Sequence, residues 1–349
     1  MEPVLHAVRQ RGGATPGTAE ETHDEGPGRS AARRPWGSGR FLAGAPDRSR
    51  GDGPADAGDG RRQPGAVTVG QDTGSVTAGV DGSRAGQDAA AWAAREARRR
   101  GLPLRLLHAG AASVLERAAE ELACAYPYVE IIGVRAQGPA AEALLAASAE
   151  AELLVLGTRG FTGFAGFPVG SVALAAAARA SCPVVLVRSG ERPEDERDAV
   201  PGIPPDEAPY LPVVLGVDLE RPAEALVGHA FRTAAVRPAP LHAVHTWTPP
   251  CPDRDAPAGL TSPAETAVEE DTREHLLAAW LRPWQRRFPG TAVETEVVLG
   301  RPVQQLLRTC ARAGLLVIGR RGGPGRGLGE VAHSLVHHAT CPVAVVPYD

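Results

Sequence analysis

The 349 residues contain no lysine and no asparagine, so arginine and histidine carry all of the positive side-chain charge. A Walker-type phosphate loop depends on its lysine, and this class of nucleotide site is therefore excluded. A phosphate bound by this chain must be held by backbone N–H groups, by serine or threonine hydroxyls, or by arginine.

Features of secreted, membrane-bound and nucleic-acid-binding proteins are also missing. The five cysteines show no C-x-x-C spacing, which argues against a disulfide framework and a structural zinc site and indicates a reducing compartment. No apolar run approaches the length of a membrane span, and the sequence starts without a signal-peptide pattern. The formal net charge of −4 offers no basic surface for nucleic acid or anionic lipid. We expect a cytoplasmic protein with no metal, no nucleic-acid partner and no membrane partner.

Composition divides the chain into four parts. Residues 1–72 are rich in glycine, proline and charged residues, with too few apolar residues to bury a core, and are predicted to be a disordered tail. Residues 73–190 and residues 211–349 are each predicted to form a folded domain. The stretch between them, residues 191–210, is rich in Glu, Asp, Arg and Pro and is predicted to be a linker.

Short apolar stretches alternate with helix-like segments in the first domain. The predicted strands are residues 76–81, 104–108, 129–134, 153–156 and 183–187, and the predicted helices are residues 85–100, 113–126, 140–149 and 172–180. Continuously apolar strands that alternate with helices are typical of a parallel sheet covered on both faces. The pattern begins again at Val213, so we predict an α/β fold with two tandem open parallel five-stranded sheets.

A duplication explains this second start, because matched features of the two halves keep a constant separation within blocks of sequence. The same number of residues separates Asp81 from Asp218 and His108 from His245. A larger number separates Gly138 from Gly300 and Gly157 from Gly319. A third number, slightly smaller than the second, separates Gly170 from Gly329 and Cys182 from Cys341. The first change of separation places an insertion after His245. The second places a short deletion in the second glycine loop.

The loop after the fourth predicted strand carries the residues best suited to bind phosphate. It has the pattern G-x-x-G-x9-G-S, formed by Gly157, Gly160, Gly170 and Ser171. The first two glycines allow close approach of a ligand and positive φ, whereas the last two residues open a helix whose free N–H groups and dipole attract anions. Asp81 follows the first strand and is expected at the same edge of the sheet, where its carboxylate can accept hydrogen bonds from ribose or base.

This pattern, followed by a helix and by Cys-Pro-Val-Val-Leu-Val, resembles the ATP-binding signature of the universal stress protein family. The opening Gly-Val-Asp-Gly-Ser, the strand Pro-Leu-Arg-Leu-Leu-His and the turn Gly-Thr-Arg-Gly resemble the same family. The resemblance covers about residues 75–188 and 211–348, and it is to tandem members from high-GC actinobacteria.

The resemblance implies Rossmann-like domains of the adenine-nucleotide alpha hydrolase type that bind ATP or AMP, with or without magnesium. It implies that Asp81 and Ala109 line the adenosine end of the site. It further implies that the ribose and phosphates contact Leu156, Gly157, Arg159, Gly160, Gly170, Ser171 and Val172. Pairing of modules, within the chain or in a homodimer, is implied as well. Ala173 departs from the family, because ATP-binding members often carry a second hydroxyl at this position.

The second copy departs further from the pattern. Gly319 and Gly322 survive, but only six residues separate Gly322 from Gly329, and Glu330 occupies the position of the serine. A carboxylate at a helix N-terminus occupies the N–H groups that a phosphate needs and repels its charge. We predict a degenerate site, although the arginines of this loop leave weaker anion binding open: Arg320, Arg321 and Arg326.

These observations predict a stress-response regulatory protein that binds ATP or AMP through its first copy, with no catalytic residue assigned. An interaction or dimerisation scaffold that binds no nucleotide is the alternative, since the second copy already lacks the serine. A slow ATPase is the lesser alternative, because no general base is evident beside the loop and no lysine can stabilise a transferred phosphate.

Overall fold

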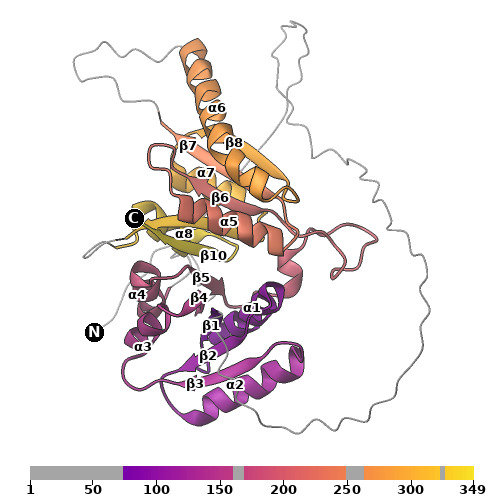
Figure 1. The fold of residues 1–349 in the computed structure, drawn as a ribbon, viewed down its shortest axis with the longest axis vertical. Helices are drawn as coiled ribbons and strands as arrows, with labels where there is room; N and C mark the ends of the chain where they lie inside the picture. Colours follow the sequence, from indigo (N-terminus) through magenta and orange to yellow (C-terminus); the bar gives the residue numbers. More distant parts are fainter. Residues whose placement is uncertain (1–73, 160–168, 249–262, 323–326) are drawn as a thin grey trace, which may run out of the picture. The chain divides into compact units, whose positions relative to one another are not determined.

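The computed structural model describes residues 74–159, 169–248, 263–322 and 327–349, and within them it confirms the predicted α/β fold. The tail predicted to be disordered, residues 1–72, lies outside the described residues. Strands and helices alternate through both halves of the described chain (Figure 1). None of the helices in these ranges is long and apolar enough to cross a lipid bilayer.

The first half begins with a strand and a well-capped helix. Ser83 precedes the helix and accepts a hydrogen bond from Gly86 N, and Gly101 ends it with a left-handed φ of 65°, which glycine adopts without strain. The described elements of this half are β1 (Ser75–Gly79), α1 (Arg84–Arg100), β2 (Leu104–His108), α2 (Ala112–Ala125), β3 (Ile131–Arg135), α3 (Ala140–Ala147), β4 (Ala151–Thr158), α4 (Ser171–Arg179) and β5 (Val184–Arg188).

The second half repeats this order of elements after a short 3-10 helix, η2 (Pro193–Glu196). Its elements are β6 (Val213–Val217), α5 (Glu224–Val236), β7 (Leu241–Trp247), α6 (Pro263–Arg287), β8 (Val293–Leu299), α7 (Pro302–Cys310), β9 (Leu315–Arg321), α8 (Glu330–His338) and β10 (Val343–Tyr348). Helix α6 has 25 residues, whereas its counterpart α2 has 14. The insertion predicted after His245 therefore lengthens a helix, and residues 249–262, which precede that helix, lie outside the described ranges.

The ten described strands form one sheet in the order β3-β2-β1-β4-β5-β10-β9-β6-β7-β8. Neighbouring strands within each half are parallel, as predicted. The halves meet through β5 and β10, which are antiparallel, with Val184 opposite Val345 and Leu186 opposite Val343. The two modules thus pair edge to edge within the chain. Because the joint is antiparallel, the carboxyl ends of the strands lie at opposite ends of the sheet in the two halves.

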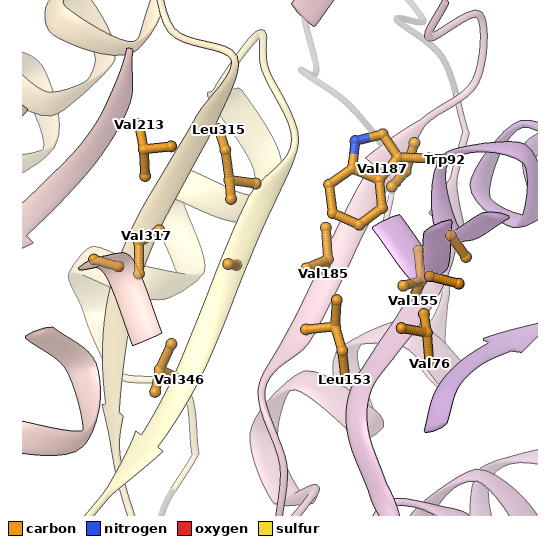
Figure 2. Packing of buried hydrophobic residues seen from close by; sticks show 14 of the residues in the cluster. Val76, Trp92, Leu153, Val155, Val185, Val187, Val213, Leu315, Val317 and Val346 are labelled. Atoms are coloured by element: carbon orange, nitrogen blue, oxygen red, sulfur yellow. The ribbon is translucent and has the colours of Figure 1, made fainter. Parts of the chain in front are cut away.

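Apolar side chains of both halves belong to one continuous cluster of buried residues. Val76 and Val155 of the first half are members together with Leu315 and Val317 of the second (Figure 2). Helix α1 contributes buried residues to this cluster: Ala89, Ala90, Trp92, Ala93 and Ala97. Burial of apolar surface is the main stabilising term in folding, so a shared cluster stabilises the two halves as one unit.

The duplicated histidines occupy matching positions. His108 Nδ1 lies 2.7 Å from the carbonyl oxygen of Val80, and His245 Nδ1 lies 3.0 Å from that of Val217. Both rings are buried and tie the end of the second strand of a module to the end of its first. The hydrogen bonds give both histidines a structural role, in agreement with the repeat deduced from the sequence.

Buried charges cross between the halves as well. Arg237, which follows α5, donates from Nη2 to Oε2 of Glu96 in α1 over 2.7 Å, and its Nη1 lies 3.5 Å from Oε2 of Glu196 in η2. Its guanidinium lies 4.8 Å from the ring centroid of Trp92. Arg95 donates from Nη2 to Oε1 of Glu196 over 2.9 Å. A carboxylate from the stretch predicted as a linker therefore lies in the interior, between arginines of both halves.

Arginines keep these buried carboxylates ionised. Burial by itself raises the pKa of Glu96, but Arg237, Arg100 and Arg99 outweigh it and lower that pKa to about 2. Burial also raises the pKa of Glu196, but Arg237, Arg99 and Arg95 outweigh burial and lower that pKa. An ionised group without a partner in this interior would be strongly destabilising, so each charge depends on partners from elsewhere in the chain.

Candidate functional site

The predicted site residues of the first half come from the carboxyl ends of neighbouring strands. Gly79 of β1 lies opposite the next-to-last residue of β2 and opposite Leu156 of β4. The three strands therefore end at nearly the same level. Asp81 lies two residues beyond β1, Ala109 follows β2 and Gly157 is next to last in β4, so the register brings them to one edge of the sheet.

Asp81 has a local partner at this edge. Its Oδ1 accepts a hydrogen bond from Ser83 N over 2.9 Å and another from Ser83 Oγ over 2.5 Å. Ser83 Oγ in turn accepts a hydrogen bond from Gly86 N. The carboxylate helps to start α1 and remains exposed at the edge of the sheet. A ligand would contact a side chain whose position is already fixed.

Gly157 owes its identity to packing. A Cβ at this position would lie 2.2 Å from the carbonyl oxygen of Ala85, in the first turn of α1. Of the two predicted reasons, the positive φ is wrong, since Gly157 is not in the left-handed region, and the close approach of a ligand stays a prediction. Its lack of a side chain lets α1 approach β4 closely and brings the start of that helix against the predicted site.

The start of α4 is open to anions. Gly170 precedes the helix with φ −64° and Ser171 is its first residue, and both are exposed. Among the described residues no side chain caps these N–H groups, and nothing lies within 4 Å of a Cβ placed on Gly170. Arg159 is exposed after β4, and Val172 is half-buried. Gly160, the remaining predicted residue of this loop, lies outside the described ranges.

The corresponding edge of the second half contains a cavity of about 910 Å³. The repeat separations relate it to the predicted site, because the counterparts of eight of the nine predicted positions line it. These counterparts are Asp218, Thr246, Ile318, Gly319, Arg321, Gly329, Glu330 and Val331. The positions deduced from the sequence of the first copy thus surround one cavity in the second.

Helix α6 lines the same cavity with residues that the sequence pattern did not predict. Leu276 and Trp280 of α6 lie along it, together with Trp247 at the end of β7. The guanidinium of Arg273 lies 4.3 Å from the ring centroid of Trp247 and is paired with Glu269. The only signal in the sequence was the position of Trp247, two residues after His245, since the insertion makes α6 longer than its counterpart α2.

The start of α8 differs from that of α4 in charge and in backbone shape. Gly329 precedes the helix with φ 77°, and Glu330 is its first residue, exposed at the cavity. A Cβ at Gly319 would lie 2.5 Å from Cε1 of Tyr348, so the aromatic ring of the last strand covers this glycine. A carboxylate therefore faces the space where a phosphate would meet the helix.

The sequence model of the universal stress protein family matches residues 73–122, 109–188 and 209–347. The universal stress protein Rv1996 of Mycobacterium tuberculosis is 30% identical over 316 residues, which cover 78% of this chain and 96% of that protein. Another from the same organism, Rv2623, is 31% identical over 301 residues, with 77% and 95% covered. The crystal structure of a universal stress protein from Archaeoglobus fulgidus has the same fold, with a TM-score of 0.52 at 15% identity over 78% of this chain and 98% of that one.

Proposed function

The chain belongs to the universal stress protein family, and we propose that it is a cytoplasmic stress-response regulator that binds ATP or AMP through its first copy. The observation that carries this proposal is the open start of α4. It lies beyond the carboxyl end of β4, where ligands of parallel α/β sheets bind. Support also comes from the cavity of the second half, since matching positions there surround a single volume.

In this proposal backbone N–H groups take the place of the lysine that the chain lacks. The first N–H groups of α4 and the hydroxyl of Ser171 would donate to phosphate oxygens, assisted by the positive end of the helix dipole. Arg159 would add a full positive charge. Asp81 and Ala109 would line the adenosine end, with Leu156, Gly157 and Val172 beside the ribose. Gly160 belongs to the same proposed site.

Helix α1 offers a route from this site to the second half. Its first turn lies against Gly157, and its last turns carry Glu96, Arg99 and Arg100 into the charge network that includes Arg237. A nucleotide that shifts the start of α1 would therefore act on the contact between the halves. We propose that nucleotide binding changes this contact, or changes the affinity of a partner that recognises it.

The second copy supports the first without holding a phosphate of its own in this proposal. Glu330 stands where Ser171 stands in the first copy, and its charge would repel a phosphate at the start of α8. The expected stoichiometry is therefore one nucleotide per chain.

Equilibrium dialysis of the full chain with labelled ATP or AMP, with and without magnesium, tests the proposal. We expect saturable binding of one nucleotide per chain, at least tenfold weaker in Ser171→Glu, because this variant reproduces the charge of the second copy. Ser181→Glu is the matched control, since it places the same change at an exposed position just beyond the other end of α4.

Two outcomes would contradict the proposal. Binding that Ser171→Glu leaves unchanged would place the nucleotide elsewhere in the chain. The absence of saturable binding to the folded protein would favour the scaffold alternative.

A further inference from the structure

A second cavity, of about 350 Å³, lies where β5 leads into the residues before the second half. Its lining includes Arg188 and Glu191 from the end of the first half, and Cys310 and Cys341 from the second half. Cys310 is the last residue of α7, and Cys341 precedes β10 by two residues. The proposed nucleotide site uses neither of these thiols.

The two thiols line this cavity together, and each affects the pKa of the other through a thiol–thiol hydrogen bond. Cys310 Sγ lies 3.4 Å from the carbonyl oxygen of Leu307. The side chains of Cys310 and Cys341 are 1% and 6% exposed, so the cavity is their route to small molecules.

The first half contains the same arrangement with oxygen in place of one sulfur. The separation that relates the third and fourth strands of the two copies also relates Ser148 to Cys310, and Cys182 is the counterpart of Cys341 in the shared Cys-Pro-Val. Ser148 Oγ accepts a hydrogen bond from Ser181 N over 3.1 Å, and the backbone N–H of Thr340, the counterpart of Ser181, lowers the pKa of Cys310. A single serine-to-cysteine difference between the copies therefore creates a pair of thiols in a frame that both copies share.

The surroundings favour a nucleophilic sulfur at Cys310. The hydrogen bond from Cys341 lowers the pKa of Cys310 and outweighs the opposing effect of burial, with further help from Thr340 N–H and from Arg188. The hydrogen bond to Cys310, together with burial, raises the pKa of Cys341. In the first half, burial raises the pKa of Cys182 to about 11. Thiolates rather than thiols react with oxidants, so Cys310 differs in chemistry from its structural neighbours.

We propose that Cys310 and Cys341 form a peroxide-reactive dithiol, with Cys310 as the attacking sulfur and Cys341 as the resolving one. The Cys310 thiolate attacks one oxygen of hydrogen peroxide, so that an S–O bond forms and the O–O bond breaks. The other oxygen leaves as hydroxide and becomes water by taking up the proton that the Cys310 thiol released. Cys341 then gives up its proton and attacks the resulting sulfenic sulfur. The S–O bond breaks, the S–S bond forms, and the oxygen leaves as water. Overall, two thiols and one peroxide give a disulfide and two waters.

Peptide mapping of the full chain decides the proposal. The reduced protein is treated with one equivalent of hydrogen peroxide, its remaining thiols are blocked with N-ethylmaleimide, and tryptic peptides are identified by mass. Cleavage after arginine places Cys310, Cys341 and Cys182 in three different peptides. We expect a Cys310–Cys341 cross-link that dithiothreitol reverses, while Cys182 remains blocked by the maleimide.

Two variants sharpen the test. Cys310→Ser installs the residue that the first copy carries at this position, and it should fold normally and lose the cross-link. Cys182→Ser is the matched control, and its cross-link should equal that of the unchanged protein. Maleimide on both Cys310 and Cys341 after peroxide, or a cross-link from either one to Cys124 or Cys251, would overturn the proposal. These measurements need no nucleotide, so their outcome is independent of the test of nucleotide binding.

Discussion

Glu96 and Arg237 lie 141 residues apart in the sequence and are joined by a 2.7 Å hydrogen bond between fully buried side chains. One belongs to the first helix of the first module and the other follows the first helix of the second. The pair therefore links equivalent elements of the two copies, and each side chain neutralises a charge that the interior would otherwise have to hold alone.

Removing the arginine should be strongly destabilising. Arg237→Met leaves Glu96 without its main partner, and we expect a loss of about 3–5 kcal/mol in the free energy of unfolding. Arg232→Met, an exposed change in the helix that Arg237 follows, should shift the free energy of unfolding by less than about 0.5 kcal/mol. The double variant Glu96→Gln, Arg237→Met should recover part of the loss, because no charge of the pair is then left unpartnered. Urea denaturation checks all three, and equal stability of Arg237→Met and the double variant would contradict the argument.

A glycine comparison tests the contact between α1 and β4. Gly157→Ala places a Cβ 2.2 Å from the Ala85 carbonyl oxygen, which belongs to backbone and cannot turn aside. We expect a loss of about 1–3 kcal/mol, as for other overpacked positions. Gly170→Ala is the control, because its φ of −64° suits any residue and nothing lies within 4 Å of the added atom. Thermal unfolding of both variants should show a lowered midpoint for Gly157→Ala alone.

Glu191 should make stability depend on pH. Burial, together with Asp195 and Glu196, raises the pKa of Glu191 to about 8 from an ordinary value of 4.5. The folded state therefore binds more protons than the unfolded state between these values. The stability contributed by Glu191 is complete below pH 4.5 and is lost as the pH rises through 8. The free energy of unfolding falls over this range by at most about 1.4 kcal/mol per pH unit.

The variant Glu191→Gln should flatten this part of the stability curve. Glu194→Gln, at an exposed neighbouring carboxylate, should leave it unchanged. Urea midpoints measured from about pH 5 to about pH 8 provide the comparison. The buried Glu96 does not interfere, because its lowered pKa affects stability only under more acidic conditions. Parallel curves for the unchanged protein and Glu191→Gln would show that this carboxyl group is not protonated in the fold.

The second copy provides the reciprocal of the test at Ser171. Glu330→Ser removes the charge at the start of α8 and restores the residue type of the first copy. We expect the stoichiometry of ATP to rise above one per chain, with weak binding at the new site because its loop is shorter. Binding that stays at one per chain would show that the shortened loop alone excludes the nucleotide.

Local patterns predicted most of the fold. Apolar runs and capping residues located α1 and β2 to within a residue, and constant separations predicted the matching environments of His108 and His245. The antiparallel joint between β5 and β10 escaped prediction, because a continuously apolar strand suits a central position whichever way its neighbour runs. The fold class therefore followed from the sequence, whereas the contact between the modules did not.

The site was predicted unevenly for a similar reason. The glycine pattern identified positions whose counterparts surround the cavity of the second half, but Trp280 and Arg273 come from α6, which an insertion has made longer than its counterpart α2. Glu96 and Glu196 resembled surface charges, since one belongs to an arginine-rich helix and the other to an acidic, proline-rich stretch. Their burial depends on Arg237, a partner too distant in the sequence for local pattern to reveal.

The antiparallel joint has a consequence for how this protein evolved. The strand order read inward from β3 is the same as that read inward from β8, which is the arrangement that two identical subunits adopt around a twofold axis. In such a dimer every mutation enters both sites at once. A chain that carries both modules is free of that constraint, because a mutation in one copy leaves the other unchanged, and Ser171 and Glu330 differ at matching positions.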